Sequence, residues 1–333
     1  MQAQFDIEVV DDINGLTKLM PAWLALETSV GKSPFQTYAW NWSWWQYVGS
    51  NSADHALHVI CFRLDGRVVG IAPLMIDSTS EESRLTFLGA PWNDYNDILM
   101  DLEPPLLGQG TARLAAHLRE GTGSAWHALD LSDVPPWSPL ITPADGDTGH
   151  FRIGADTSVC PQRSLIRDAD SQLTKNNHRK LRELQRHGAV ELNIITDADR
   201  LQTAMPDFMA MHIRQWHGRP DCETTFDQAD ILRFYAYSIP ELAGSGLLCL
   251  IELTLAAQPV GYAYGFLHGG AFMSYRASHE VGLADLSPGT VMHALAFHRL
   301  HGLGYRTFDF LRGYHSYKDR FADRSVTGVR VEL

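Results

Sequence analysis

The same order of secondary-structure signals occurs twice in this chain of 333 residues. Each occurrence contains two helical segments, a set of strands joined by short turns, and then a helix followed by a strand. A segment rich in Pro, Gly and Asp at 134–148 lies near the junction. We interpret the repeat as an internal duplication. It predicts an α/β (α+β) protein whose halves, residues 1–165 and 166–333, each contain a mixed, mainly antiparallel sheet flanked by helices.

The first half begins with an apolar run at 5–10, and its clearest element is a hairpin in which Asp65-Gly66 joins strands 56–64 and 67–76. We also expect an amphipathic helix at 16–27, an aromatic-rich helix at 35–47, strands at 84–88 and 98–101, a helix at 110–120 and a strand at 126–131. In the second half the sequence predicts helices at 173–187, 200–217, 227–242 and 288–302. It predicts strands there at 190–195, 247–255, 259–267, 271–277, 307–310 and 326–333.

Composition excludes several classes of function. A net charge of −12 disfavours a DNA-binding protein, because DNA phosphates attract basic surfaces. The basic stretch from Lys175 to Arg186 is local and better suits phosphate groups on a small ligand. No stretch approaches the roughly 18 consecutive apolar residues of a membrane span, and the acidic N-terminal segment does not resemble a signal peptide. We therefore expect a cytoplasmic protein without a membrane span. The scattered cysteines predict no metal site, and the sequence does not define an oligomeric state.

The run Leu286-Ser287-Pro288-Gly289-Thr290 precedes the predicted helix at 288–302. Ser287 is a suitable N-cap, Pro288 suits the first turn, and Gly289 permits close approach to the backbone. Free amides and the helix dipole would then bind a phosphate or pyrophosphate. The alternative is a capped helix start that binds nothing.

A second run, Phe308-Asp309-Phe310-Leu311-Arg312-Gly313, is followed by Tyr317-Lys318. Asp309 ends a strand and is either a site carboxylate or a structural one that pairs with Arg312 and braces the turn. Arg312 and Lys318 could neutralise phosphates or hold a carboxylate. Tyr317 could give a proton to a leaving group.

Other polar residues are candidates for contact with a substrate. In the polar loop 88–97, Asp94, Tyr95 and Asp97 could face an acceptor beside Trp92, or Asn and Asp side chains could simply stabilise the turn. His178 and Arg179 belong either to a binding surface or to a solvated face. His279 follows a strand that contains Arg276 and could supply a general base. The sequence contains no HExxH, GxSxG, Walker or Rossmann fingerprint.

Taken together, these runs resemble the CelD-type acetyltransferases, a branch of the GNAT superfamily first associated with bacterial cellulose biosynthesis. The resemblance rests on LSPGT (286–290), FDFLRG (308–313), YK (317–318), FLGAPWNDYNDIL (87–99) and SPFQTYAWNWSWW (33–45). It covers nearly the whole chain, from about Phe35 to Lys318. It implies two tandem GNAT-like domains, as in the related Fem-type aminoacyltransferases of cell-wall synthesis.

The resemblance also implies an activity. GNAT enzymes let an acceptor attack a thioester directly, while a backbone amide steadies the oxyanion and a tyrosine or water protonates the thiolate. We therefore expect acyl-CoA, in particular acetyl-CoA, as co-substrate and an amine or hydroxyl of a small molecule or saccharide as acceptor. The first half would carry the acceptor side with a degenerate donor site, and the second half would carry the donor site.

These expectations assign roles to particular residues. The catalytic candidates are Asp309, Tyr317 and His279. The donor-binding candidates are Ser287, Pro288, Gly289, Thr290, Arg312 and Lys318. The acceptor-binding candidates are Trp92, Asp94, Tyr95, Asp97, His178, Arg179 and Arg276. Two alternatives stay open: a Fem-like transferase that uses aminoacyl-tRNA, favoured by the basic helix and opposed by the net charge, and a non-catalytic binding protein that kept the fold.

Overall fold

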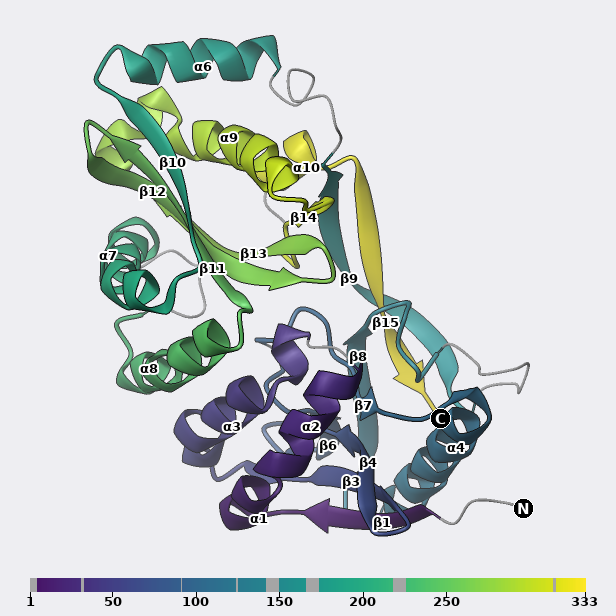
Figure 1. Ribbon diagram of the computed structural model, residues 1–333. Coiled ribbons are helices and arrows are strands. Elements are labelled where there is room, and N and C mark those ends of the chain that lie inside the picture. The colour runs from purple at the N-terminus through teal and green to yellow at the C-terminus, as the bar shows by residue number, and fades with distance from the viewer. Residues whose placement is uncertain are drawn as a thin grey trace. The chain divides into compact units, whose positions relative to one another are not determined.

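The computed structural model describes residues 5–30, 33–90, 92–123, 125–141, 150–165, 174–217, 226–313 and 316–333. It divides into two compact units: unit 1 contains Met1–Cys160 and Val326–Leu333, and unit 2 contains Pro161–Ser325. Both are α/β structures with mixed sheets flanked by helices, as the sequence predicts (Figure 1). The final strand, which we had placed in the second half, returns to unit 1.

Unit 1 contains two groups of strands. One sheet has the order β1-β3-β4-β7, and the other group runs β15-β8-β6-β5-β2. The strands of the first sheet are β1 (Phe5–Val10), β3 (Val59–Leu64), β4 (Arg67–Ala72) and β7 (Leu99–Met100). Those of the second group are β2 (His55–Leu57), β5 (Leu74–Asp77), β6 (Arg84–Phe87), β8 (Ala128–Val134) and β15 (Arg324–Glu332).

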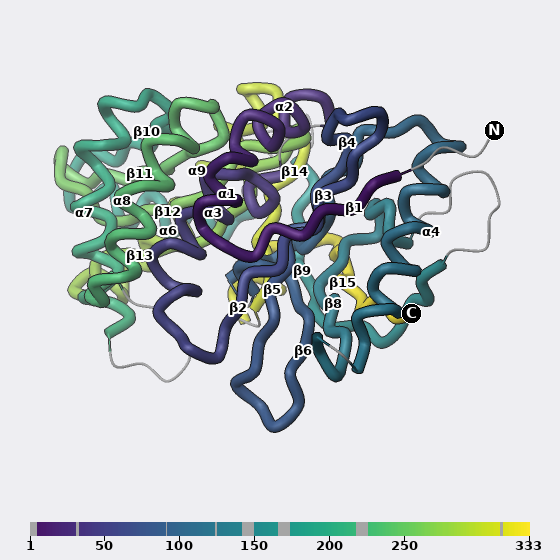
Figure 2. Tube along the Cα trace, turned by 90° about the horizontal axis from the view of Figure 1, so that it is seen from below, coloured from purple at the N-terminus to yellow at the C-terminus, as the bar shows by residue number. Residues whose placement is uncertain are grey.

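The predicted hairpin is confirmed, but each of its strands is broken once. Leu64 pairs with Arg67, and Asp65 and Gly66 have φ of 51° and 78°, the left-handed values that a two-residue hairpin turn requires. The strands stop at His58 and at Pro73, which has no N–H to donate to a ladder. Beyond these breaks β2 pairs with β5, and β5 with β6, in the second sheet. The β5–β6 hairpin stands out in Figure 2.

Four helices of unit 1 are α1 (Ile13–Lys18), α2 (Met20–Val30), α3 (Tyr38–Tyr47) and α4 (Pro104–Gly121). The helix expected at 16–27 is therefore two helices, with Leu19 between them. The aromatic segment forms α3 as predicted, and its Trp40, Trp44 and Trp45 are buried. Burial of such large side chains contributes strongly to the stability of this unit.

Unit 2 is built on the strand order β10-β11-β12-β13-β14-β9. The strands are β10 (Val190–Ile195), β11 (Leu248–Leu255), β12 (Gln258–His268), β13 (Ala271–His279), β14 (Thr307–Asp309) and β9 (Arg152–Ser164), which starts in unit 1. The pairs from β10 to β13 are antiparallel. β13 and β14 run parallel, with Ala271 opposite Thr307 and Met273 opposite Asp309.

The helices of unit 2 cover both faces of this sheet (Figure 1). They are α6 (Lys175–Gln185), α7 (Ala198–Trp216), α8 (Ala229–Gly244), α9 (Pro288–Gly302) and the short α10 (Ser316–Phe321). α9 packs against β11, β12 and β13, and α7 and α8 pack on the other face. The buried residues of α9 include Val291, Met292 and Leu300, which join Ile251, Phe272 and Phe308 of the strands in one apolar cluster. The sequence predicted α9 with its observed bounds and missed β9 and α10.

Unit 1 contains one buried carboxyl group that makes its stability depend on pH. Asp97 is 9% exposed and accepts hydrogen bonds from Ser138 Oγ (2.6 Å) and the Ile98 amide (2.8 Å). Burial outweighs these bonds and raises the pKa of Asp97 to about 7. The folded state therefore binds a proton that the unfolded chain releases above its ordinary pKa of 3.8.

We predict that unit 1 loses up to about 4 kcal/mol of stability as the pH rises from about 4 to about 7, because only the folded state keeps this proton over that range. Above about pH 7 the loss does not grow further. Asp97→Asn mimics the protonated form and removes the dependence. Urea unfolding followed by tryptophan fluorescence reports mainly on unit 1, because Trp216 is the single tryptophan within 161–325. Asp65→Asn, at the exposed hairpin turn, is the matched control. Equal pH profiles for wild type and Asp97→Asn would contradict the prediction.

Candidate active site

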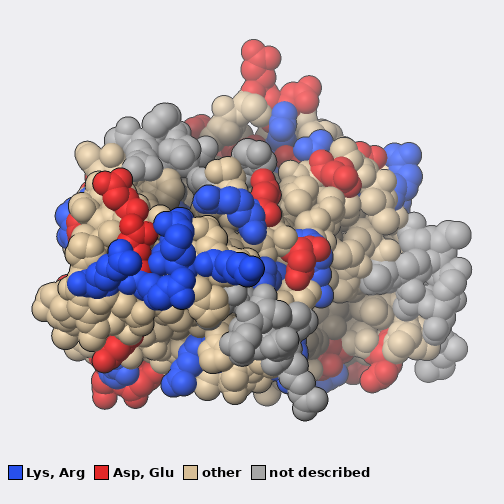
Figure 3. Space-filling model, turned by 90° about the horizontal axis from the view of Figure 1, so that it is seen from above, with Lys and Arg blue, Asp and Glu red and all other residues tan. Residues whose placement is uncertain are grey.

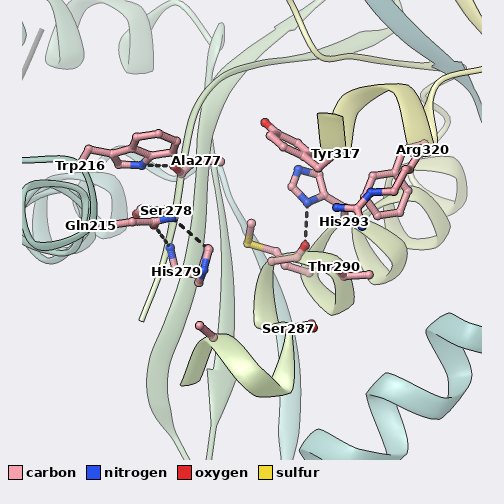
Figure 4. A pocket seen from close by; sticks show the side chains of 14 residues that line it. Gln215, Trp216, Ala277, Ser278, His279, Ser287, Thr290, His293, Tyr317 and Arg320 are labelled. Carbon is pink, nitrogen blue, oxygen red and sulfur yellow. Dashed lines mark hydrogen bonds between the residues drawn. The ribbon is translucent and has the colours of Figure 1, made fainter. Parts of the chain in front are cut away.

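A cavity of about 320 Å³ lies in unit 2 where β13 ends and α9 begins. The chain leaves β13 at His279, passes through a short 3₁₀ segment (Val281–Leu286) and enters α9 at Pro288. The residues that line the cavity come from α7, β13, α9 and α10. Figure 4 shows Gln215, Trp216 and His279 on one side of it and His293, Tyr317 and Arg320 on the other.

The turn before α9 has an unusual backbone. Ser287 has φ 55° and ψ 50°, the left-handed region that non-glycine residues rarely occupy. Its carbonyl accepts from the amides of both Thr290 (3.0 Å) and Val291 (3.2 Å). Pro288 has no N–H. Among the amides of the first turn, the Gly289 N–H is therefore the one without a hydrogen-bond partner within the described residues. Because Ser287, Gly289 and Thr290 line the cavity, the positive end of α9 faces it.

The predicted capping role of the Ser287 side chain is wrong. Ser287 is the N-cap residue of α9, but its side chain makes no capping hydrogen bond. Instead, Ser287 Oγ accepts a hydrogen bond of 3.0 Å from Lys180 Nζ of α6. The prediction that Pro288 occupies the first turn is confirmed. Lys180, which we had not singled out by itself, therefore adds a positive charge beside the start of α9.

Two histidines line the cavity in opposite tautomers. The backbone N–H of His279 donates to Gln215 Oε1 (2.7 Å), so the amide nitrogen of Gln215 must face His279 Nδ1, at 3.3 Å. His279 Nδ1 is thus an acceptor, and the neutral ring carries its proton on Nε2. His293 Nδ1 donates to the Gly289 carbonyl at 2.7 Å, so its Nε2 has the bare lone pair.

His293 is the side chain that sequence reasoning missed. It is 5% exposed, and its Nε2 has no hydrogen-bond partner in the described part of the chain. Burial lowers its pKa to about 4, which keeps the ring neutral at pH 7. Its ring packs against Tyr317 (5.5 Å between centroids) and Phe310 (5.8 Å). In the sequence, a histidine within an apolar helix face looks like a core residue. Only the cavity shows that His293 is a candidate site residue.

Tyr317 lines the cavity as a phenol. Burial raises its pKa to about 12, so it stays protonated throughout the neutral range. Ser278 also lines the cavity, with a buried Oγ that makes no hydrogen bond within the described ranges. Trp216 is fixed because its Nε1 donates to the Ala277 carbonyl at 3.1 Å.

The other residues of the second motif do not line the cavity. Asp309 is 2% exposed, and its carboxylate accepts from Gln162 Nε2 (2.7 Å) and the Leu311 amide (2.8 Å). Lys318 is 5% exposed and donates to the carbonyls of Leu311 (3.1 Å) and Arg312 (2.6 Å). These bonds hold a turn in which Leu311 has φ 55°. These bonds are structural, and the catalytic role of Asp309 stays a prediction.

The predicted acceptor residues of unit 2 lie outside the cavity as well. Arg179 is exposed on α6, where it contacts Glu183 (3.4 Å) and Asn176 (3.1 Å), and His178 lies beside it on the same helix. Arg276 of β13 stacks on the Tyr275 ring at 5.0 Å and donates to the Tyr235 hydroxyl at 3.3 Å. Their role in acceptor binding stays a prediction.

The polar loop of unit 1 is largely buried. Tyr95 is 3% exposed and Asp94 8% exposed, and the Tyr95 ring lies 5.3 Å from that of Trp137. Asn93 bonds to the Leu88 carbonyl, to Asn96 and to Trp40 Nε1, and the ring of Trp92 packs edge-on against Trp44. Side-chain bonds of Asn and Asp within the loop are those of the stabilised turn that we gave as the alternative.

The described residues contain no group of three His, Cys, Asp or Glu side chains that could hold a metal ion. Within the same ranges, no helix is both long and apolar enough to cross a membrane.

Comparison with known families finds a similarity for most of unit 2. Residues 171–319 match the model of the acetyltransferase (GNAT) domain. Most of unit 2 is thus similar to a GNAT acetyltransferase domain. The match covers α6 to α9 and the first residues of α10, and it contains the lining residues of the cavity except Arg320 and Phe321. The protein is accordingly a transferase, a GNAT-fold acyltransferase. No curated protein matches the chain.

Solved structures share the fold of the whole chain. FemX is 10% identical, with a TM-score of 0.57 over 98% of this chain and 97% of that one. The C-terminal domain of a putative lysylphosphatidylglycerol synthetase from Agrobacterium fabrum is 10% identical, with a TM-score of 0.56 over 96% and 92%. L-PGS from Bacillus licheniformis is 10% identical, with a TM-score of 0.55 over 93% and 90%. At these identities the similarity concerns the fold.

We predict that Lys318→Met destabilises unit 2 by about 2–3 kcal/mol, because two buried carbonyls lose a charged donor. Lys175→Met, at an exposed position of α6, removes the same charge and should change stability by less than about 0.5 kcal/mol. Chemical unfolding monitored by far-UV circular dichroism measures both. A Lys318→Met protein as stable as wild type would show that this ammonium group does not brace the turn.

Proposed function

We propose that this GNAT-fold acyltransferase takes its acyl group from acyl-CoA, with acetyl as the acyl group, and transfers it to an amine or hydroxyl of a small molecule or saccharide. One observation carries the proposal: the first turn of α9 lines a cavity together with Arg320, and Lys180 lies at the same turn. The Gly289 N–H, the helix dipole and cations at one place attract an anion such as the pyrophosphate of coenzyme A. The CelD-like motifs of the sequence agree with this donor.

The thioester would then extend along the end of β13. The pyrophosphate rests at Gly289 and Thr290, and the pantetheine arm follows the cavity wall towards Ser278 and His279. Trp216 and Met292 contribute apolar surface to that wall. An apolar cavity with a few oriented polar groups is the usual form of a small-molecule site.

The tautomers of the two histidines suggest how protons move. His279 carries its proton on Nε2 and can donate a hydrogen bond to the thioester oxygen as negative charge develops there. His293 has a bare Nε2 and can accept the proton of the attacking nucleophile. The low pKa of His293 suits proton transfer after the amine has attacked the thioester, because the attacking nitrogen is then positively charged and gives up its proton more readily. Tyr317, protonated at neutral pH, donates to the departing thiolate.

We predict that wild-type protein binds CoA in isothermal titration with a Kd below 1 mM, about the upper end of KM values typical of enzymes. Arg320→Ala should weaken binding about tenfold, or about 1.4 kcal/mol, because a cation at the cavity is lost. Arg299→Ala removes an exposed cation from the opposite end of α9 and should leave the affinity within twofold. Absence of binding at millimolar CoA would exclude this donor.

A matched pair of variants tests His293. In His293→Asn, the side-chain NH₂ can still donate near the position of Nδ1 to the Gly289 carbonyl, but the acceptor at the position of Nε2 is lost. In His293→Gln, the longer side chain can place its amide oxygen near the position of Nε2. We predict that His293→Asn lowers kcat at least tenfold, with CoA affinity within threefold, and that His293→Gln retains more activity than Asn. Activity is measured as thiol release from acetyl-CoA with an amine acceptor. Equal kcat for wild type and His293→Asn would remove the proton-accepting role.

A Fem-like transfer from aminoacyl-tRNA is the second candidate. It is favoured by the cations that α6 presents: Lys175, Arg179, Lys180, Arg182 and Arg186 all lie on or at the end of this helix. Figure 3 shows Lys and Arg gathered on the face seen from above, the side of α6 in Figure 1. A gel shift with aminoacyl-tRNA that weakens steeply with salt would support it.

A further inference from the structure

A second, smaller cavity of about 150 Å³ adjoins the first in unit 2. The two cavities share Thr290, Arg320 and Phe321 as lining residues. The other residues that line the smaller one come from the start of α6 and from β9, which contributes Arg163. A ligand in the first cavity therefore has a neighbouring space into which a second group of its own can extend.

Three cations line the second cavity, namely Arg163, Lys180 and Arg320. Within the described residues none of them has a carboxylate at ion-pair distance, and no acidic residue lines the space. Burial, followed by the positive charges of Arg320 and Arg179, holds the pKa of Lys180 below its ordinary value. Burial likewise lowers the pKa of Arg163. An anion between these groups would relieve both effects.

The cavity is also built of fixed donors. Arg163 Nη1 donates to the Phe321 carbonyl at 2.8 Å, and its guanidinium stacks on the Phe297 ring at 4.9 Å. Arg163 Nε is buried and makes no hydrogen bond to any described residue. Asn177 is 7% exposed, and its backbone N–H donates to Thr174 Oγ1 at the start of α6. These groups are held in place before a ligand binds, which reduces the entropy lost on binding.

Size and charge select the kind of anion. The volume of about 150 Å³ is enough for one phosphate group, because one water molecule needs only about 10–15 Å³ on the same measure. A phosphate monoester carries about −1.5 to −2 charges at pH 7, more than the single charge of a diester or carboxylate. Three cations around one space match the monoester best.

We propose that this second cavity is a subsite for a phosphate monoester of the donor, distinct from the pyrophosphate position at the start of α9. The inference rests on the proposed function and makes it narrower: the donor is a thioester carrier that bears both a pyrophosphate and a separate monoester, as CoA does with its 3′-phosphate. Dephospho-CoA, which lacks only that group, is then a poor ligand. Lys180 and Arg320, with Arg163, are the residues that discriminate.

Isothermal titration of the full chain with CoA and with dephospho-CoA tests the subsite. We expect wild type to bind CoA at least tenfold more tightly. In Lys180→Met the ratio of the affinities for CoA and dephospho-CoA should fall to threefold or less, because the cation facing the monoester is lost. Arg182→Ala removes an exposed cation of the same helix that does not line the cavity, and its ratio should stay that of wild type. Lowering the pH from 7.5 to 5.5 should shrink the wild-type ratio, because the monoester gains a proton with a pKa near 6.

The possible outcomes separate this inference from the proposed function. Equal affinities for CoA and dephospho-CoA in wild type would overturn the subsite and leave the acyl-CoA donor standing. A wild-type preference that Lys180→Met and Arg182→Ala retain equally would also overturn it, because the monoester would then be bound elsewhere. Failure of both compounds to bind at millimolar concentration would overturn the donor and the subsite together.

Discussion

The parallel pairing of β13 with β14 is the constraint on which the site depends. Antiparallel neighbours can be joined by a tight turn, as β11, β12 and β13 are, but parallel strands need a crossover. α9 is that crossover, and it must start at the end where β13 finishes. The helix amides therefore open beside His279 and Ser278, at the end of a strand that already lines the cavity. One topological requirement thus brings together the residues proposed to bind the donor and those proposed to react.

The apolar packing under α9 fixes the direction of that helix. Val291, Met292, Phe297 and Leu300 are buried against the strands, so α9 cannot turn about its axis without exposing them. Opposite the helix start, Asp309 and Lys318 hold the turn that leads to Tyr317 and Arg320. These two charged residues do not line the cavity described above, but the turn they brace leads into the cavity residues of α10. Their place in the family-like motif is explained by this bracing.

Much of the fold could be predicted because periodicity and turn chemistry are local signals. The Asp65-Gly66 hairpin, β10 and α9 were predicted with close to their observed bounds for that reason. β9 was missed because Arg, Gly, Asp and Pro interrupt its alternation, and its pairing with β14 depends on residues far away in the chain. α10 is too short to show a helical period. The helix at 16–27 was predicted as one because the break at Leu19 has no Gly or Pro signal.

The candidate site was predicted in part. The segment 287–290 and the side chains of His279 and Tyr317 line the cavity, because a helix start and a strand end are visible in sequence. Asp309 and Lys318 carry the charge of site residues but form internal bonds instead, and sequence cannot distinguish these uses of a charge. His293 and Lys180 were not singled out, since the first looks like core and the second like one of several exposed cations. Only the fold brings Lys180 to Ser287.

The route of the chain has a consequence for biosynthesis. β15 belongs to unit 1 and pairs with β8, with Val329 opposite Val134 and Val331 opposite Leu131, yet it is synthesised after all of Pro161–Ser325. On the ribosome, unit 2 can thus acquire its complete sheet while unit 1 still lacks a strand. An incomplete sheet leaves unpaired N–H and C=O groups open to other chains. Unit 1, although it is translated first, is the last to be completed and the part of a nascent chain most exposed to aggregation.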